Sequence, residues 1–265
     1  KGNNGGDGLA VARHLLLDNV DTTVFVFAKP EEFKGDAALN LSLYQKLDGK
    51  LIFVEELNQK RLLKLAVAQA DFVVDALYGT GFRGALPSYM EDYVEEVNNS
   101  KAWVVAVDIP SGVEADTGRV YRVCVRANKT VTFGLPKLGH FLGEGPASVG
   151  ELVVDRISIP DAYLEDEAIT TFLLTEDYAR KLIPKRDFRG HKGTHGKGVL
   201  VAGSPGMTGA AVLAGRGALR NGIGLLYVVS SEKAAETIDA QLTEGVVYAL
   251  PGEDKLTASE ALEVL

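Results

Sequence analysis

Cysteine, histidine and long apolar runs are scarce in this sequence of 265 residues. The single cysteine, Cys124, excludes an intrachain disulfide framework and favours the reducing cytoplasm. With only four histidines beside it, a zinc site is not expected. No apolar run approaches the roughly 20 residues of a membrane span, so we expect no membrane partner.

Acidic residues outnumber basic ones, which argues against a nucleic-acid partner. The formal net charge is -8 and the pI is about 5.1, whereas binding to a phosphate backbone usually needs a concentrated basic face. The one basic cluster, KLIPKRDFRGHK at 181–192, is more simply interpreted as a solvated linker. The chain is long enough for two domains, which is the organisation we expect.

Short β-rich runs alternate with longer amphipathic runs, a pattern that predicts βαβ units and parallel sheets. The acidic, non-periodic stretch at 160–170 interrupts the alternation and marks the expected domain boundary. Residues 119–134 and 150–160 have the short alternation typical of sheet-edge strands. Strands are predicted at 22–29, 50–56, 71–75, 102–108, 196–204, 225–231 and 245–252, and helices at 8–19, 36–49, 59–70, 88–99 (capped by Ser88), 208–222 and from Glu232 onward.

Three loops carry short polar side chains: the opening run KGNNGGDG, the loop after the strand that ends at Asp75, and the loop that starts at Asp108. Because ligands bind at the carboxyl ends of parallel strands, we expect these loops to share one site. Their oxygens suit a hard cation or a polyhydroxylated ligand, and N–H groups at a helix N-terminus suit phosphate. Any one of them alone is more often structural, at a helix dipole, a turn or a strand end, but two strands that both run into aspartate and then a glycine-containing turn favour a site. The residues concerned are Asn3, Asn4, Asp7, Asp75, Thr80, Arg83, Asp108 and Ser111.

The segment GTGFRG at 79–84 matches the glycine pattern of a dinucleotide-binding fingerprint. In that fingerprint the third glycine opens a helix, but here Pro87 precedes any helical periodicity. We therefore interpret the segment as a ligand loop of another kind.

Four motifs in order resemble the NAD(P)HX epimerase family, of the YjeF N-terminal type: GNNGGDGLAVARHL, VVDALYGTGFRG, VVAVDIPSGVEADTG and TVTFGLPKLGH. The resemblance covers roughly residues 1–160. Residues 191–229 resemble the start of an ADP- or ATP-dependent NAD(P)HX dehydratase, although His195 stands where that pattern usually has tyrosine. The resemblance implies a Rossmann-like parallel three-layer α/β sandwich at 1–165 and the beginning of a ribokinase-like α/β domain at 166–265.

The resembled enzymes repair NADH and NADPH that have been hydrated at C6 of the nicotinamide ring. An epimerase interconverts the R and S forms, and a dehydratase returns the S form to NAD(P)H with ADP or ATP. The resemblance also implies a homo-oligomer, and a potassium ion at Asn4, Asp75 and Ser111, with Asp108 as acid/base or charge stabiliser. Contacts with the cofactor are implied for Asn3, Asn4, Gly5, Gly6, Asp7, Gly79, Thr80, Gly81, Phe82, Arg83, Gly84, Ala85 and Asp108, and in the second domain for Ala210, which core packing would explain equally well.

Two other functions remain open from the sequence: a non-catalytic binding scaffold, and an NAD-dependent dehydrogenase that uses GTGFRG. The strand that would feed the opening run is not in the sequence, and neither is the later glycine-aspartate helix start of ribokinase-like enzymes. We therefore expect the natural polypeptide to extend on both sides of these residues, and the missing strand to leave unpaired edges within the first sheet.

Overall fold

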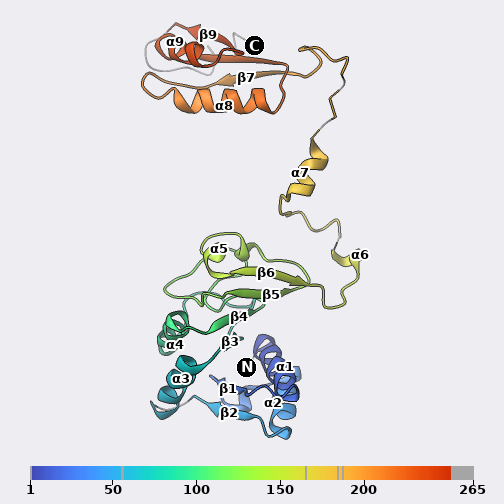
Figure 1. Ribbon diagram of the computed structural model, residues 1–265, viewed down its shortest axis with the longest axis vertical. Coiled ribbons are helices and arrows are strands. Elements are labelled where there is room, and N and C mark those ends of the chain that lie inside the picture. Colours follow the sequence, from blue (N-terminus) through green and yellow to red (C-terminus); the bar gives the residue numbers. More distant parts are fainter. Residues whose placement is uncertain (1, 55–56, 165, 184, 187, 252–265) are drawn as a thin grey trace. The chain divides into compact units, whose positions relative to one another are not determined.

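The protein is described here by a computed structural model that covers residues 2–54, 57–164, 166–183, 185–186 and 188–251 (Figure 1). The chain divides into two compact units, residues 1–171 and 172–265, each of which is described by itself. The predicted boundary between residues 165 and 166 falls a few residues before this division. The ends of the predicted strands at 50–56 and 245–252, and residues 184 and 187 of the basic cluster, lie outside the described residues.

The first unit contains two parallel sheets. One pairs β1 with β2, and the other has four strands in chain order, which confirms the predicted parallel α/β architecture. Among the described strands, β1 and β3 each lie at the edge of their sheet. The strands are β1 (Thr23–Val26), β2 (Lys50–Phe53), β3 (Phe72–Asp75), β4 (Trp103–Val107), β5 (Lys129–Phe133) and β6 (Glu151–Asp155).

The prediction of edge strands is right for β6 but wrong for β5, which lies between β4 and β6. The alternating polar residues within β5 are threonines, and their hydroxyls form hydrogen bonds in the interior of the unit. Thr130 is fully buried and donates to the carbonyl of Val149, while the Thr132 hydroxyl donates to Asp108. A satisfied hydroxyl can be buried at little cost, so polar alternation does not by itself distinguish an edge from a centre.

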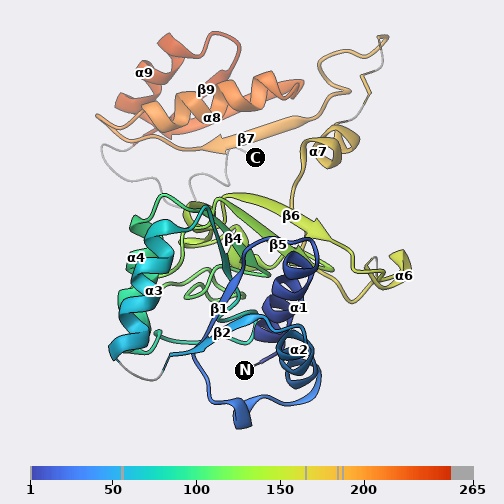
Figure 2. The ribbon, with the colours of Figure 1, turned by 60° about the horizontal axis from the view of Figure 1, so that its bottom comes forward.

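Two helix pairs pack in the first unit, α1 (Asn3–Leu17) with α2 (Gly35–Lys46) and α3 (Leu57–Gln69) with α4 (Ser88–Asn99), as Figure 2 shows. Helix α1 also contacts β1 of one sheet and β4 of the other. Its buried Leu9 and Ala12 join a cluster with Tyr44 of α2, whose ring is completely buried. This packing attaches α1 to both sheets.

The structure corrects the predicted start of one helix and the predicted cap of another. Helix α1 begins at Asn3, so that Asn3 to Asp7 form its first turns and not a loop before it. Helix α4 begins at Ser88, with Pro87 in the capping position and no side-chain cap. The fixed φ of Pro87 suits its extended conformation just before the helix.

The second unit contains a three-stranded parallel sheet in chain order, with the helices predicted for it. Its core gathers Val228 of the central strand and Ile238 of the following helix, both fully buried. Its elements are β7 (Lys197–Val201), α8 (Gly209–Arg220), β8 (Leu225–Ser231), α9 (Glu232–Gln241) and β9 (Val246–Leu250). Shorter helices elsewhere are η1 (Pro30–Glu32), η2 (Leu138–His140), α5 (Gly145–Ser148), α6 (Asp161–Leu164) and α7 (Glu176–Leu182).

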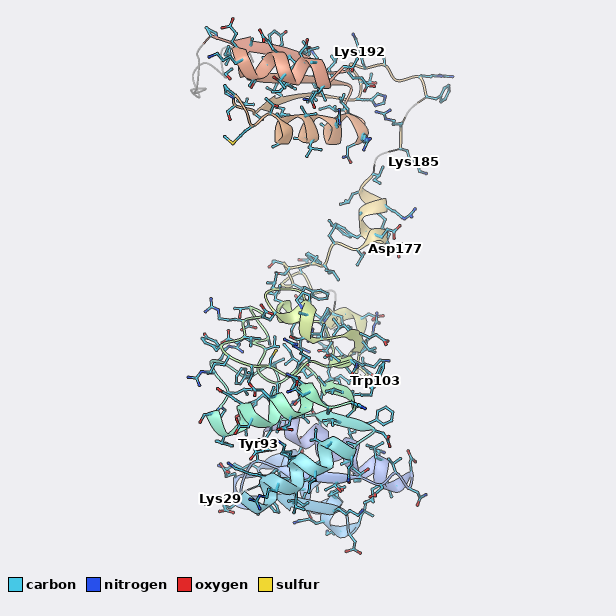
Figure 3. All side chains as sticks on the ribbon, turned by 60° about the vertical axis from the view of Figure 1, so that its left-hand side comes forward. Lys29, Tyr93, Trp103, Asp177, Lys185 and Lys192 are labelled. Carbon is cyan, nitrogen blue, oxygen red and sulfur yellow. The ribbon has the colours of Figure 1, made fainter. Side chains whose placement is uncertain are left out.

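Exposed aromatic residues mark the amino ends of two neighbouring strands. Phe72 begins β3 and pairs in register with Trp103 of β4, which projects from the ribbon in Figure 3. The polar residues predicted to form the site lie at the opposite, carboxyl ends of the same strands. Across the described ranges, no helix combines the length and apolar character needed to cross a bilayer.

Gly8 allows α1 to pack closely against the end of β3. A Cβ at this position would lie 2.4 Å from the Cβ of Ala76. We expect Gly8→Ala to lower the stability of the first unit by about 1–3 kcal/mol, the usual cost of overpacking. Urea denaturation would measure the loss. The matched control is Gly217→Ala on α8, where a Cβ meets nothing within 4 Å; equal or greater loss in the control would contradict this account of Gly8.

Candidate active site

The first turn of α1 meets the loop after β3. A Cβ at Gly79 would lie 3.0 Å from Cγ of Asn4, so glycine is what allows this approach. The side-chain nitrogen and oxygen of Asn4 are both buried, and neither has a hydrogen-bond partner among the described residues. Buried amides are normally satisfied, which makes this amide a candidate for binding a ligand or an ion.

Asp75 and Ser111 join the ends of β3 and β4. Asp75 is 5% exposed, and its carboxylate accepts the backbone N–H of Ser111 at 2.7 Å and the Ser111 hydroxyl at 2.6 Å. The same hydroxyl accepts the N–H of Tyr78 at 2.9 Å. The sequence predicted that these loops would meet, and the structure brings them together.

Burial raises the pKa of Asp75, while the hydrogen bonds from Ser111 and Leu77 oppose that shift. None of the ion pairs in the described residues involves Asp75. A buried carboxylate without a counter-charge, near the unpartnered amide oxygen of Asn4, fits the oxygen ligand set of a hard cation. Asn4, Asp75 and Ser111 could therefore hold such an ion.

Asp108 directly follows β4 in a left-handed conformation, with φ of 68°. Its N–H donates to the carbonyl of Val131, which ties the turn to β5. One carboxylate oxygen, Oδ1, accepts the Thr132 hydroxyl at 2.9 Å and the Lys137 ammonium at 2.7 Å. In the hydrogen bonds of the described residues, Oδ2 has no partner. One oxygen of Asp108 is thus held while the other is left for a ligand.

Asp7 of α1 lies near enough to Asp108 for their charges to interact. Partial burial and the charge of Asp108 both raise the pKa of Asp7. Two neighbouring carboxylates repel one another unless donors or a proton lie between them. The hydroxyl groups of a sugar or of a hydrated ring would supply such donors.

The loop at 79–85 is fixed by its own contacts. The N–H of Gly84 donates to the Glu114 carboxylate at 2.9 Å, and Arg83 donates to the carbonyls of Thr80 and Phe82 and pairs with Asp116. The Phe82 side chain is buried in an apolar cluster. Helix α4 begins only after Pro87, which confirms that the third glycine does not open a helix. Asn3, Thr80, Gly81 and Ala85 are exposed, and Gly5 and Gly6 lie within α1.

Ala210 belongs to the second unit, where it is the second residue of α8 and is exposed. The core of that helix is formed by its neighbours Ala211 and Val212. Core packing therefore does not explain Ala210, and its predicted ligand contact remains a prediction.

The structure adds Thr132, Lys137, His140 and Glu114 to the residues predicted for the site. The His140 side chain is 1% exposed; its Nδ1 accepts the N–H of Lys137 at 3.1 Å, and its Nε2 lies 2.9 Å from the carbonyl of Asp108. Because a backbone N–H can only donate and a carbonyl only accept, the imidazole is neutral with its proton on Nε2. The motif TVTFGLPKLGH contains three of the four residues, but neither its spacing nor its composition indicated a role for them.

Two cavities flank the ring of Phe133 at the end of β5. One, of about 360 Å³, lies against α1 and is lined by Asp7, Val11 and Leu15. The other, of about 450 Å³, is lined by Lys137, Ile159 and Tyr163. Asp7 and Lys137 of the site thus border space that a ring-containing ligand could enter.

A parallel α/β sheet with a polar, glycine-rich site at its carboxyl ends defines the class of this protein: a Rossmann-like ligand-binding α/β protein. A family described as "YjeF-related protein N-terminus" matches residues 1–139, and the chain belongs to this family. A second family, described as "NAD(P)H-hydrate dehydratase", matches residues 198–265.

Relatives with curated names extend the comparison. The bifunctional NAD(P)H-hydrate repair enzyme Nnr of Moorella thermoacetica is 42% identical over 95% of this chain and 47% of its own length. The NAD(P)H-hydrate epimerase of Pirellula staleyi is 37% identical over 63% of this chain and 73% of its own. The crystal structure of the yeast protein ynu0, YNL200c, aligns with a TM-score of 0.50 at 26% identity, covering 60% of this chain and 64% of that one. The chain spans about half the length of the bifunctional relatives.

Burial of His140 links the stability of this site to pH. Burial lowers the pKa of His140 below its ordinary value of 6.5 and outweighs the hydrogen bond to the Asp108 carbonyl, which raises it. The Lys137 ammonium lowers the pKa further, and the charge of Asp108 raises it least. The unfolded chain therefore takes up a proton more readily, and the free energy of unfolding should decrease as pH falls below 6.5, by at most about 1.4 kcal/mol per pH unit.

Urea denaturation between pH 7.5 and 5.5 would check this. In His140→Gln the free energy of unfolding should decrease less over this range than in the wild type. His14→Gln, on the exposed face of α1, is the control and should keep the wild-type slope. An unchanged slope in His140→Gln would refute the assignment to His140.

Proposed function

We propose that the first unit catalyses the interconversion of the R and S forms of NAD(P)H hydrated at C6 of the nicotinamide ring. The observation that carries this proposal is Asp108, a carboxylate with one oxygen held by Thr132 and Lys137 and the other without a partner in the described residues. The names of the relatives support the substrate, because both an epimerase and bifunctional repair enzymes are similar to this unit.

Epimerisation requires a bond at C6 to break and form again. In this proposal Asp108 acts at that centre as acid/base or charge stabiliser. Asn3 to Asp7 and the loop at 79–85 bind the remainder of the dinucleotide. The N-terminus of α1 favours the negative charge of the pyrophosphate, since its first N–H groups have no partner within the helix.

A potassium ion bound by Asn4, Asp75 and Ser111 is the second part of the proposal. Such an ion would supply a positive charge beside the buried carboxylate of Asp75. Contacts within the protein position the loops around this site. Ser111 links the ends of β3 and β4, and Gly79 leaves room for the side chain of Asn4.

We further propose that the complete protein couples this epimerase to a dehydratase that uses ADP or ATP, acts in the cytoplasm and forms homo-oligomers. The dehydratase match over 198–265 and the bifunctional relatives support the coupling. Ala210, exposed on α8, is the residue proposed to contact the ligand there.

A dehydrogenase that uses GTGFRG is less well supported. The N–H of Gly84, which would have to face a pyrophosphate, instead donates to the carboxylate of Glu114. A negative charge at that position would repel phosphate. A non-catalytic scaffold, in turn, does not account for a mostly buried lysine–aspartate pair whose lysine lines a cavity.

Asp108→Asn is the decisive variant for the epimerase. Asparagine tolerates the left-handed conformation, so the fold should be retained while the charge is lost. We expect the rate of interconversion to fall by about 10²–10⁴, the usual contribution of a general acid–base group. Chromatographic separation of R and S NADHX, incubated with the complete protein without nucleotide, measures the rate. Full activity with unchanged binding would show that Asp108 has no such role.

Potassium should stabilise the folded protein through Asp75. Because the ion binds only the folded state, we expect potassium chloride to raise the unfolding midpoint by about 2–4 °C per kcal/mol of binding energy, relative to choline chloride of equal ionic strength. Asp75→Asn should remove the difference between the two salts. The midpoint of the variant in one salt is not informative, because removing a buried unpaired charge can itself stabilise. Equal midpoints in both salts for the wild type would exclude the ion.

A further inference from the structure

Lys137 forms three hydrogen bonds where the ends of β4 and β5 meet. Its ammonium lies 2.7 Å from Oδ1 of Asp108, 2.7 Å from the Thr132 hydroxyl and 2.9 Å from the carbonyl of Phe133. The Lys137 side chain is 21% exposed and that of Asp108 is 12% exposed. The pair is thus held in one geometry, and its lysine lines the cavity beside Phe133.

The buried side chain of His140 holds Lys137 and Asp108 in this geometry. Its ring accepts the backbone N–H of Lys137 on one side and donates to the carbonyl of Asp108 on the other. The backbones of the two charged residues are therefore joined by a single buried side chain. Their separation is set by the fold and does not depend on the flexible lysine stem alone.

The stability of the protein gives little reason for such a pair. A partly buried ion pair often contributes no more than well-packed apolar residues of similar size, because desolvation offsets the attraction. A pocket lined by a few converging polar groups is a candidate functional site, and Lys137 lines such a pocket. Asp108 supplies a negative charge here, and Lys137 supplies protons.

We propose that Lys137 is a catalytic residue, the group that gives a proton to the C6 hydroxyl of hydrated NAD(P)H and takes one back. This inference rests on the proposed epimerase function and assigns Asp108 the charge-stabilising role. The substrate takes the place of the Phe133 carbonyl or the Thr132 hydroxyl as acceptor of one Lys137 proton.

The proposed reaction is balanced in atoms and charge. Lys137 transfers a proton to the C6 hydroxyl oxygen, the C6–O bond breaks, and the lone pair of the ring nitrogen forms a C=N bond as water leaves. C6 is now planar and has lost its configuration. Water then adds to either face of C6, the C=N electrons return to nitrogen, and a proton of that water passes to the Lys137 amine. The Asp108 carboxylate offsets the positive charge as it moves from the lysine to the ring and back.

Lys137→Arg tests proton transfer separately from charge, because arginine keeps the positive charge but does not release its proton in proteins. In the complete protein we expect kcat for interconversion of R and S NADHX to fall by about 100-fold or more. KM should stay within about threefold, because the charge that orients Asp108 remains. The control is Lys129→Arg, at the start of β5 and ion-paired with Glu151 of β6 away from Asp108, which should retain the wild-type kcat.

The outcomes separate this inference from the function on which it rests. If the wild type interconverts the epimers and Lys137→Arg does so equally fast, the lysine is only a counter-charge and the inference is wrong. If the wild type does not interconvert them at all, the proposed epimerase function itself fails.

A second variant covers the case in which Lys137→Arg does not fold. Lys137→Ala leaves space for a small amine, so added ethylamine should restore activity in proportion to its concentration if the missing group is a proton donor. Absence of rescue in a folded Lys137→Ala protein would overturn the inference. In H₂¹⁸O the wild type should incorporate ¹⁸O at C6 as it epimerises, beyond an enzyme-free control, and epimerisation without incorporation would overturn the proposed reaction.

Discussion

The hydrogen bonds between Asp75 and Ser111 determine how the site is assembled. A carboxylate that is almost fully buried must be satisfied, and Ser111 satisfies it twice, with its backbone N–H and its hydroxyl. These bonds hold the loop after β4 against the end of β3, and the N–H of Tyr78 extends the network along the loop. Gly79 follows directly and admits the side chain of Asn4. The position of α1 relative to the sheet thus depends on the buried carboxylate of Asp75, through the loop that contacts Asn4.

The sequence was sufficient to predict which loops meet, but not how the carboxylates are held. Asp75 and Asp108 each follow an apolar run, and parallel strands place their ends at one edge of the sheet, so their proximity followed from topology. The roles of Lys137 and His140 depend on a turn after β5 that returns the chain towards Asp108. Neither periodicity nor composition predicts that the chain turns back towards Asp108, because long-range packing determines this turn.

Most of the predicted helices and strands were correct in type, and the errors have local causes. Asn3 to Asp7 looked like a loop because glycine is a poor helix former. In the structure Gly6 and Gly8 lie in α1 because Ala37 and Ala76 leave no room for a Cβ there. Burial thus favours glycine where intrinsic propensity does not.

The left-handed backbone of Asp108 has an evolutionary consequence. At φ of 68° aspartate and asparagine are among the few residues other than glycine that are tolerated, and their codons differ by one base. A single-base substitution could therefore remove the charge at the centre of the site and leave the turn, the sheet and nearly all of the sequence identity unchanged. Under the proposed function, a descendant of this gene could pass from enzyme to binding protein in one step. Overall similarity would not reveal the change, whereas the residue at this one position would.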